Sequence, residues 1–353
     1  MTDRRSEISI VDVARHADVS VGTVSRVMNN HPGVRAELRR RVRKTVRRLG
    51  FVPKVPHRCL AVVTGRHSPT LPMGYVSMMS AMICRFAAAN RYAVEIIEID
   101  QLDAVLERHF DAVIAVVFDD RVSSLTQVPN LPVITLNHPM PDGRFHNIYT
   151  DHAAQGRIAT DHLLEHGHRK IAMLAIEEDE WGSRERRTGY RNALQDAGVS
   201  FDESLVRSTV EEPVYEILSR WLHRDVTAIL NFSEDTTFEV LHVLSNVLKL
   251  RIGQDISTIT LEDLPVFRYL SPPQTSVCQP LEDLARLGVA TALELATAVR
   301  TGESIRVVGD QCLPVQLVDR ESVADLRPGA WPGETPVPPG PRDVHVQERR
   351  TVP

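Results

Sequence analysis

The chain has 353 residues, 42% of them hydrophobic and 25% charged, which suits a soluble protein with a small domain beside a large or two-lobed one. Its net charge of −5 is unevenly distributed, because residues 1–58 hold 14 Lys and Arg against 5 Asp and Glu, a net of +9, and the remainder carries −14. No apolar run is long enough for a membrane span and the N-terminus lacks the apolar core of a signal peptide, so we expect a cytoplasmic protein.

Two short helices separated by a tight break are predicted near the N-terminus. Ser9 is a suitable N-cap for the first helix, with Asp12 three positions later, and Ser20 is a suitable N-cap for the second. The apolar positions recur three and four residues apart, so each helix has one inward face: Val13, Ala14 and Ala17, then Val24, Val27 and Met28. This layout predicts a helix-turn-helix, whose second helix lies in the major groove of DNA.

A third helix is expected over 35–49, ending at Gly50, which occupies the position favoured by a C-terminal glycine. The helix is strongly basic. A basic helix beside a helix-turn-helix predicts phosphate contacts, although a run of charge alone is more often a solvated face. The charged residues are Arg39, Arg40, Arg41, Arg43, Lys44, Arg47 and Arg48.

Arg26 is the main candidate for reading a base, because a guanidinium group binds O6 and N7 of guanine with two hydrogen bonds. The alternative for Arg26 is a phosphate contact. Val21 can meet a thymine methyl group, whereas Gly22 reads nothing directly. The remaining candidates are hydroxyl and amide groups that suit phosphates or the groove wall, and any of them can instead cap a helix or lie on the surface: Ser9, Ser20, Thr23, Ser25 and Asn29.

The rest of the chain alternates between predicted strands and helices. Strands are expected at 59–64, 93–99, 112–118, 132–136, 171–176, 228–232 and 256–261, and helices at 75–89, 152–166, 185–197, 236–249 and 281–299. This alternation predicts parallel sheets with helices on both faces, and the number of strands favours two lobes. Ligands of such folds bind beyond the carboxyl ends of the strands, which suggests a cleft between the lobes.

The N-terminal segment resembles the lactose/galactose repressor (LacI/GalR) family, whose signature reads roughly D-V-A-x-x-A-x-V-S-x-x-T-V-S-R-V-x-N. Residues 12–29 match it at most positions. Weaker similarity continues to about residue 325, notably in Gly167–Ile171, Pro272–Ser276 and Leu317–Ser322. The resemblance implies a dimeric repressor of operator DNA, with a body like that of periplasmic sugar-binding proteins and no enzymatic activity.

Four segments follow from this resemblance and the sequence pattern: a helix-turn-helix head at 8–53, a linker at 54–58, a bilobed effector-binding and dimerisation body at 59–326, and a disordered tail at 327–353. The tail contains seven prolines in 27 residues and cannot form a core.

The resemblance places four residues near a small-molecule effector: Asp151, Arg186, Glu234 and Gln279. Tyr75 is a fifth candidate, because it lies next to the expected first cleft loop, Pro72-Met73-Gly74. Converging charged and amide groups can orient hydroxyl or carboxylate groups, and Tyr75 can stack on a sugar face. Alternatives remain for three of them. Tyr75 can be a core or dimer-interface aromatic, Asp151 can be a helix N-cap, and Arg186 can form a surface ion pair. A sugar or a nucleoside is the expected effector.

Three departures from the family pattern limit this transfer. The chain has Ser233-Glu234 where the family usually has Asn-Asp, and Thr260–Asp263 where it usually has Gly-[Phe/Tyr]-Asp-Asp. Only five residues separate Pro53 from the strand-like Cys59, barely one helical turn. The family places a hinge helix there, which wedges a leucine into the minor groove, so we expect a truncated or missing hinge helix.

Two other functions are alternatives to a ligand-responsive regulator. One is a DNA-binding regulator whose body senses no small molecule and serves dimerisation or protein contact. The other is an enzyme with a DNA-binding head, for which no nucleophile–base set is evident. His162, His166 and His168 only superficially resemble a zinc motif, so no metal or cofactor is expected. The scattered cysteines Cys59, Cys84, Cys278 and Cys312 predict buried thiols in a reducing cytoplasm, where the protein would associate with the nucleoid.

Overall fold

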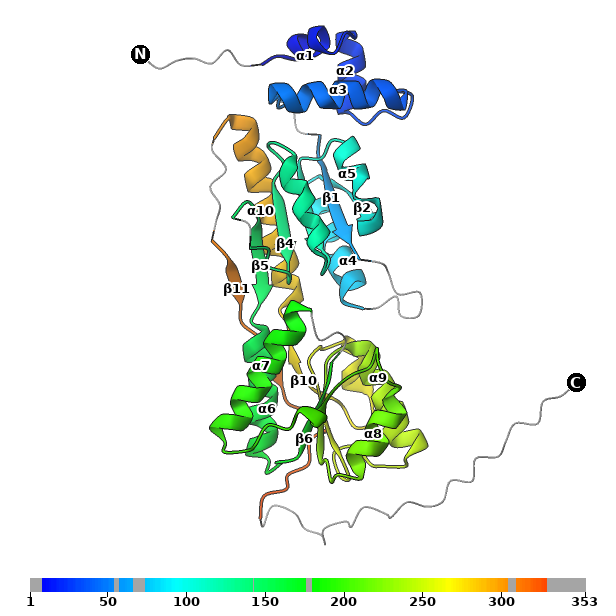
Figure 1. Ribbon diagram of the computed structural model, residues 1–353, viewed down its shortest axis with the longest axis vertical. Helices are drawn as coiled ribbons and strands as arrows, with labels where there is room; N and C mark the ends of the chain where they lie inside the picture. Colours follow the sequence, from blue (N-terminus) through cyan, green and yellow to red (C-terminus); the bar gives the residue numbers. More distant parts are fainter. Residues whose placement is uncertain are drawn as a thin grey trace, which may run out of the picture. The chain divides into compact units, whose positions relative to one another are not determined.

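A computed structural model describes residues 8–53, 57–65, 74–141, 143–175, 180–303 and 309–328. The chain divides into two compact units (Figure 1). The first comprises residues 1–156, 177–189 and 278–316, and the second comprises residues 157–176, 190–277 and 317–353. The expected tail lies outside the described residues from position 329 onward, as do residues 54–56 of the expected linker.

Three helices form the N-terminal head: α1 (Ile10–His16), α2 (Val21–Met28) and α3 (Ala36–Leu49). Their apolar faces meet in one small core, which confirms the helical periodicity read from the sequence. Helix α3 ends at Gly50, whose φ of +67° is the left-handed conformation that glycine adopts without steric cost. The core residues are Val13, Ala14, Ala17, Val24, Val27, Met28 and Val42.

The rest of the first unit is built on a six-stranded sheet of order β11-β5-β4-β3-β1-β2, in which every pairing is parallel. Its strands are β1 (Cys59–Thr64), β2 (Ala93–Glu98), β3 (Ala112–Val116), β4 (Val133–Leu136), β5 (His146–Thr150) and β11 (Gln311–Leu313). Helices α4 (Tyr75–Ala89), α5 (Asp103–Glu107) and α10 (Leu281–Thr301) accompany this sheet.

Side chains of β1 alternate between two separate cores. Leu60 and Val62 pack with residues of α4 and α10 on one face, whereas Ala61 and Val63 pack with residues of α5 on the other. Because both faces are covered, the strands are apolar throughout rather than alternating. This confirms the prediction of parallel sheets with helices on both faces.

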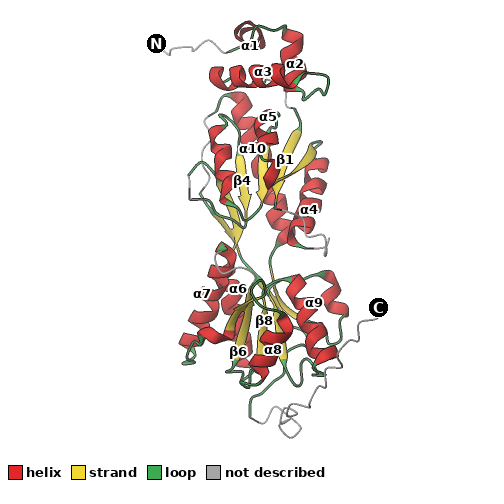
Figure 2. Ribbon diagram, turned by 45° about the vertical axis from the view of Figure 1, so that its right-hand side comes forward, coloured by secondary structure: helices red, strands yellow, loops and turns green. Residues whose placement is uncertain are grey.

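The second unit also has a sheet accompanied by helices (Figure 2). The order of its six strands is β12-β10-β9-β8-β6-β7. Its strands are β6 (Ile171–Ala175), β7 (Val206–Ser208), β8 (Ala228–Asn231), β9 (Ser257–Thr260), β10 (Thr275–Cys278) and β12 (Gln316–Val318). Helices α8 (Val214–Leu222) and α9 (Glu234–His242) follow β7 and β8. Buried Trp221 of α8 packs in one core with Ala172 and Leu174 of β6. Two helices, α6 (His152–Glu165) and α7 (Trp181–Asp196), begin in the first unit and end in the second.

All four cysteines are thiols outside any disulfide bond, but the expectation that they are buried is wrong. Cys312 is exposed, and Cys59, Cys84 and Cys278 are partly buried. They lie at or near ends of strands or within a partly covered helix face, where side chains need not be fully enclosed. No helix among the described residues is long and apolar enough to cross a membrane.

Candidate DNA interface and effector site

Ser9 caps α1 through a reciprocal pair of hydrogen bonds. The backbone N–H of Asp12 donates to Ser9 Oγ at 3.2 Å, and the backbone N–H of Ser9 donates to Asp12 Oδ2 at 3.0 Å. The bonds from Ser9 stabilise the carboxylate and lower the pKa of Asp12 below its usual range. This capping box fixes where the chain enters the head.

Ser20 caps α2, the second helix of the motif, in a similar way. The backbone N–H of Thr23 donates to Ser20 Oγ at 3.1 Å, and the two hydroxyl groups are 2.9 Å apart. At the other end of α2, Asn29 Nδ2 donates to the carbonyl oxygen of Ser25 at 3.0 Å. Ser9, Ser20 and Asn29 therefore have the capping role that is the alternative to DNA contact. All three are also exposed, so they remain accessible to DNA.

The outer face of α2 presents Val21, Gly22 and Arg26 together. All three are exposed, and Val21 keeps 41% of its surface although it is apolar. The guanidinium group of Arg26 has no hydrogen bond or ion pair within the described part of the chain, so it is available to an external acceptor. A helix with one buried stripe and one exposed face carrying a free guanidinium group is the geometry needed for reading a groove.

The basic residues of α3 divide into two groups. Arg40, Arg41, Lys44 and Arg48 are exposed, and Arg39 is partly buried. Arg43 is only 6% exposed and donates to the carbonyl oxygen of Val27 at 3.1 Å, while Arg47 donates to the carbonyl oxygen of Leu106. Burial lowers the pKa of Arg43 to about 9. The expectation of a phosphate-contacting helix thus does not extend to Arg43, whose guanidinium group is held inside the protein.

Arg186 is buried in the first unit, which excludes the surface ion pair considered for it. It is 4% exposed, and its Nε donates to Gln155 Oε1 at 2.6 Å. Close packing of α6 on α7 holds this pair, because a Cβ at Gly156 would lie 2.0 Å from the carbonyl oxygen of Arg186. Asp151 caps α6, since its Oδ1 accepts from the backbone N–H of Ala154 at 2.8 Å.

An aromatic group lies beside this polar cluster. The ring of Trp181 is 5.3 Å from that of Tyr149 and 5.2 Å from that of His152. His152 Nδ1 is 3.2 Å from Gln155 Oε1, and burial together with the charge of Arg186 lowers the pKa of His152 well below its usual value. His152 is therefore a neutral group at physiological pH.

Gln279 is held by a residue that the sequence reading missed. Asn137, directly after β4, donates from Nδ2 to Gln279 Oε1 at 2.6 Å and accepts from the backbone N–H of Thr150 at 2.8 Å. Its φ of +57° lies in the left-handed region, which asparagine tolerates better than most residues. The sequence does hold one indication of this role, because Asn137 directly follows a buried strand and ligands bind at that edge of a parallel sheet.

Tyr75, the first residue of α4, belongs to an aromatic row. Its ring is 5.7 Å from that of Phe118, which is 6.3 Å from that of His138. Phe118 follows β3 and keeps 42% of its surface exposed, and His138 follows β4. Because carboxyl ends of parallel strands share one edge, these rings lie at the same edge as Asn137 and Asp151. Neither Phe118 nor His138 was expected from the sequence.

Glu234 belongs to the second unit, where it begins α9; its side chain lies outside the described part of the chain. The helix is capped by Ser233, whose Oγ accepts from the backbone N–H of Thr236 at 3.3 Å. The serine that replaces the family's usual asparagine therefore serves as an N-cap.

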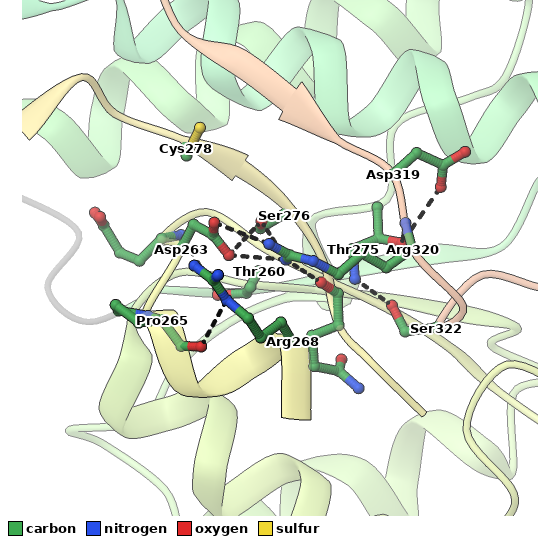
Figure 3. Close-up of polar contacts among 12 residues, drawn as sticks. Thr260, Asp263, Pro265, Arg268, Thr275, Ser276, Cys278, Asp319, Arg320 and Ser322 are labelled. Carbon is green, nitrogen blue, oxygen red and sulfur yellow. Dashed lines mark hydrogen bonds and ion pairs between the residues drawn. The ribbon is translucent and has the colours of Figure 1, made fainter. Parts of the chain in front are cut away.

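Asp263 is committed to an ion pair with Arg320 (Figure 3). Arg320 Nη1 and Nη2 donate to the two carboxylate oxygens at 2.8 and 3.0 Å, and Nη1 also donates to Ser276 Oγ at 3.1 Å. Ser322 adds a hydrogen bond to β9, since its Oγ donates to the carbonyl oxygen of Thr258 at 2.6 Å. The segment Leu317–Ser322 thus ties the C-terminal part of the second unit to β9 and β10.

The histidines near the end of α6 have structural partners. His168 Nδ1 is 2.9 Å from Thr227 Oγ1, and its Nε2 is 3.0 Å from Ser257 Oγ. Burial lowers the pKa of His168 to about 4. Among the residues that the structure describes, no group of three His, Cys, Asp or Glu side chains has the arrangement of a metal site.

Two family models match the chain. Residues 9–54 match the bacterial regulatory proteins of the lacI family, and residues 160–323 match a periplasmic binding protein-like domain. The HTH-type transcriptional regulator CelR of Thermobifida fusca is 30% identical over 348 residues, covering 91% of this chain and 99% of that protein. GalS of Salmonella typhimurium is 29% identical, covering 90% and 97%.

Solved structures agree with these matches. A CelR–cellobiose complex shares 27% identity and a TM-score of 0.65, over 89% of this chain and 99% of that one. The lac repressor dimer bound to operator and an anti-inducer has a TM-score of 0.62 at 22% identity, over 90% and 100%, a similarity of fold. These relatives are named as regulators rather than enzymes. The chain therefore belongs to the lacI family of bacterial regulatory proteins and is a DNA-binding transcriptional regulator.

Proposed function

We propose that the protein is a repressor that binds a two-fold symmetric operator as a homodimer, with Arg26 reading a base pair in each half-site. The observation that carries this proposal is the exposed, unpartnered guanidinium group of Arg26 on a helix whose opposite face is buried. The head would comprise residues 8–53, the linker 54–58 and the body 59–326. Ser9, Ser20, Thr23, Ser25 and Asn29 would contact phosphates or the groove wall beside Val21 and Gly22. Its place of action is the cytoplasm, at the nucleoid.

The body would bind a hydroxyl-rich small molecule, a sugar or a nucleoside. Support comes from the first unit, where the aromatic pair Tyr75 and Phe118 lies at the carboxyl edge of the sheet and the side chains of Asp151, Arg186 and Gln279 are held by hydrogen bonds. Aromatic faces beside fixed hydrogen-bonding groups suit a ring with one apolar face and several hydroxyls. Among the relatives, CelR was solved with cellobiose and a regulator of Enterococcus faecium with ribose. Glu234 is the candidate effector residue of the second unit.

Substitution of Arg26 tests the DNA-reading role. Arg26→Ala removes one bidentate base contact from each half-site, and each contact is worth about 1–3 kcal/mol. For the dimer the loss is about 2–6 kcal/mol, so we expect operator affinity to fall by at least about 30-fold with little change on non-specific DNA. Arg251→Ala is the matched control, because Arg251 pairs on the surface of the second unit with Asp255 at 2.7 Å. Operator titration by fluorescence anisotropy at fixed salt gives both values. Equal losses on specific and non-specific DNA would assign Arg26 to a phosphate instead.

A second candidate is a regulator whose body senses no small molecule. It is favoured by the state of three proposed effector residues, whose polar groups already have protein partners: Asp151 caps α6, Arg186 donates to Gln155, and Gln279 accepts from Asn137. A thermal-shift screen of sugars and nucleosides separates the candidates, because a ligand that binds the native state raises the unfolding temperature. A ligand that stabilises the wild type but not Gln279→Ala supports sensing.

A further inference from the structure

Asn30 joins the head to the body of its own chain through two opposed hydrogen bonds. The backbone N–H of His109 donates to Asn30 Oδ1 at 2.9 Å, and Asn30 Nδ2 donates to the carbonyl oxygen of His109 at 3.0 Å. Asn30 lies just after α2, and His109 lies between α5 and β3. One carboxamide thus satisfies both polar groups of one backbone residue, as a neighbouring strand would.

Arg43 holds the Asn30 side chain in this position. Its Nη2 donates to Asn30 Oδ1 at 2.8 Å, in addition to its bond with the carbonyl oxygen of Val27. The backbone of Asn30 has a φ of +51°, in the left-handed region where asparagine is well tolerated. Because α2, α3 and Asn30 are connected by one buried guanidinium group, the contact with His109 is built on the rigid part of the head.

The receiving surface of the body is also ordered. Asn30 Nδ2 donates to His57 Nε2 at 3.1 Å, and the ring of His57 is 5.7 Å from that of His109. Asp111, whose side chain is 6% exposed, accepts from the backbone N–H groups of His57 and Cys59, both at 3.3 Å, and lies 3.6 Å from Arg300 Nη1. The chain is therefore fixed where it enters β1, beside the surface that Asn30 contacts.

The oxygen and the nitrogen of the Asn30 side-chain amide are both used in this arrangement. Its carbonyl oxygen accepts from His109 and Arg43, and its two amide hydrogens reach the carbonyl oxygen of His109 and the ring of His57. Arg47, one turn along α3, adds a bond to the carbonyl oxygen of Leu106. A short tether of five residues between Pro53 and Cys59 keeps the two surfaces at high effective concentration, so a few bonds suffice to hold them together.

We propose that the surface formed by Leu106, His109 and His57 is a docking site for the head of the same chain, and that docking through Asn30 sets the position from which α2 meets DNA. The reading face remains available in the docked state, since Val21 and Arg26 are exposed. The docked contact would itself position the head, a role that the hinge helix has in the family pattern. In a dimer, docked heads have a defined separation, so operators with the matching half-site spacing are preferred. This last step rests on the proposed dimer and two-fold operator.

Asn30→Gly tests docking in the full-length protein. Glycine accepts the positive φ without strain and removes every side-chain bond, while Arg43 keeps its bond to Val27. Asn130→Gly is the matched control, because Asn130 has a φ of +59° and is exposed. Without DNA, we expect the His109 amide to exchange with solvent roughly tenfold faster in Asn30→Gly, the equivalent of about one hydrogen bond, and no faster in Asn130→Gly. Unchanged exchange at His109 would overturn the docking.

Operators that differ only in half-site spacing test what docking does. The wild type and Asn130→Gly should prefer one spacing, and Asn30→Gly should bind the alternatives with a flatter profile. Asn30→Asp is a second variant: it keeps an acceptor for Arg43 but places an oxygen against the carbonyl group of His109. A variant that shows faster His109 exchange but an unchanged spacing profile would overturn the positioning role. A wild type indifferent to spacing contradicts the proposed two-fold operator, and with it the positioning role, while His109 exchange still reports docking.

Discussion

Gly156 and Gly22 both lie in helices, but replacing each with alanine should have opposite effects on stability. A Cβ at Gly156 would lie 2.0 Å from the backbone oxygen of Arg186, so the helices must separate to admit it. A Cβ at Gly22 meets only Ser20 Oγ, at 3.8 Å. We expect Gly156→Ala to destabilise the protein by about 1–3 kcal/mol, as overpacking does. Gly22→Ala should stabilise the head by about 0.5–1 kcal/mol through helix propensity.

Chemical denaturation monitored by circular dichroism measures both glycine variants. Because Gly156 lies beside Arg186, its variant should also lose the proposed ligand response, whereas the Gly22 variant should keep it. A neutral Gly156→Ala would mean that α6 and α7 are less closely packed in solution than in the structure.

The histidines at the docking surface should make docking depend on pH. Burial and the charge of Arg43 lower the pKa of His109 to about 3, and burial lowers the pKa of His57 even though Asp111 opposes it. Undocked histidines near pH 6.5 bind more protons than docked ones. Docking is therefore fully favourable above about pH 6.5 and weakens as the pH falls toward the docked-state value of His109.

Nuclear magnetic resonance titration of the histidine rings checks this pH dependence. In the wild type the His109 ring should titrate well below its usual range, and in Asn30→Gly its pKa should rise toward about 6.5. The same low pKa in both proteins would show that burial of His109 is independent of the head.

At the scale of elements, the ion pair between Asp263 and Arg320 secures the C-terminal segment to two strands. Both side chains are largely buried, at 18% and 15% exposure, so removing one partner leaves the other charge uncompensated. We expect Arg320→Met to destabilise the second unit by about 3 kcal/mol. Lys170→Met is the control, since Lys170 and Asp225 are 54% and 75% exposed and such pairs contribute about 0–1 kcal/mol. Equal effects of the two variants in thermal unfolding would contradict the structural role of Arg320.

Helices and strands were predictable from sequence where one physical pattern dominated. The apolar run 59–64 and the helix 75–89 have the predicted bounds, because buried parallel strands and amphipathic helices have distinct periods. Strand β5 was missed, because buried His146 and Asn147 interrupt its apolar pattern. Helix α8 was also missed, although Val214, Ile217, Leu218 and Trp221 follow a helical period after Pro213.

The candidate site was less predictable than the fold. The family resemblance nominated Asp151 and Arg186, but partners such as Gln155 and Asn137 depend on how helices and strand ends pack. The contact of Asn30 with His109 could not be predicted from the sequence either. It joins residues 79 positions apart, and it uses the backbone of His109, which is the same whatever the side chain. Short linker length was the one hint that the head needs a different support.

At the scale of the whole molecule, ligand and operator must influence each other equally. If a sugar or nucleoside changes operator affinity by some factor, operator must change ligand affinity by the same factor. A coupling of about 1–3 kcal/mol would be typical. Because the head contacts the body at His109, we expect docking to transmit this coupling. The Asn30→Gly variant should therefore bind the ligand normally, but the bound ligand should change its operator affinity by a factor near one. Calorimetry can measure ligand affinity with and without operator for the wild type, Asn130→Gly and Asn30→Gly. The ratio of the two affinities is the coupling factor of each protein. Full coupling in Asn30→Gly would show that the body controls the head through another contact.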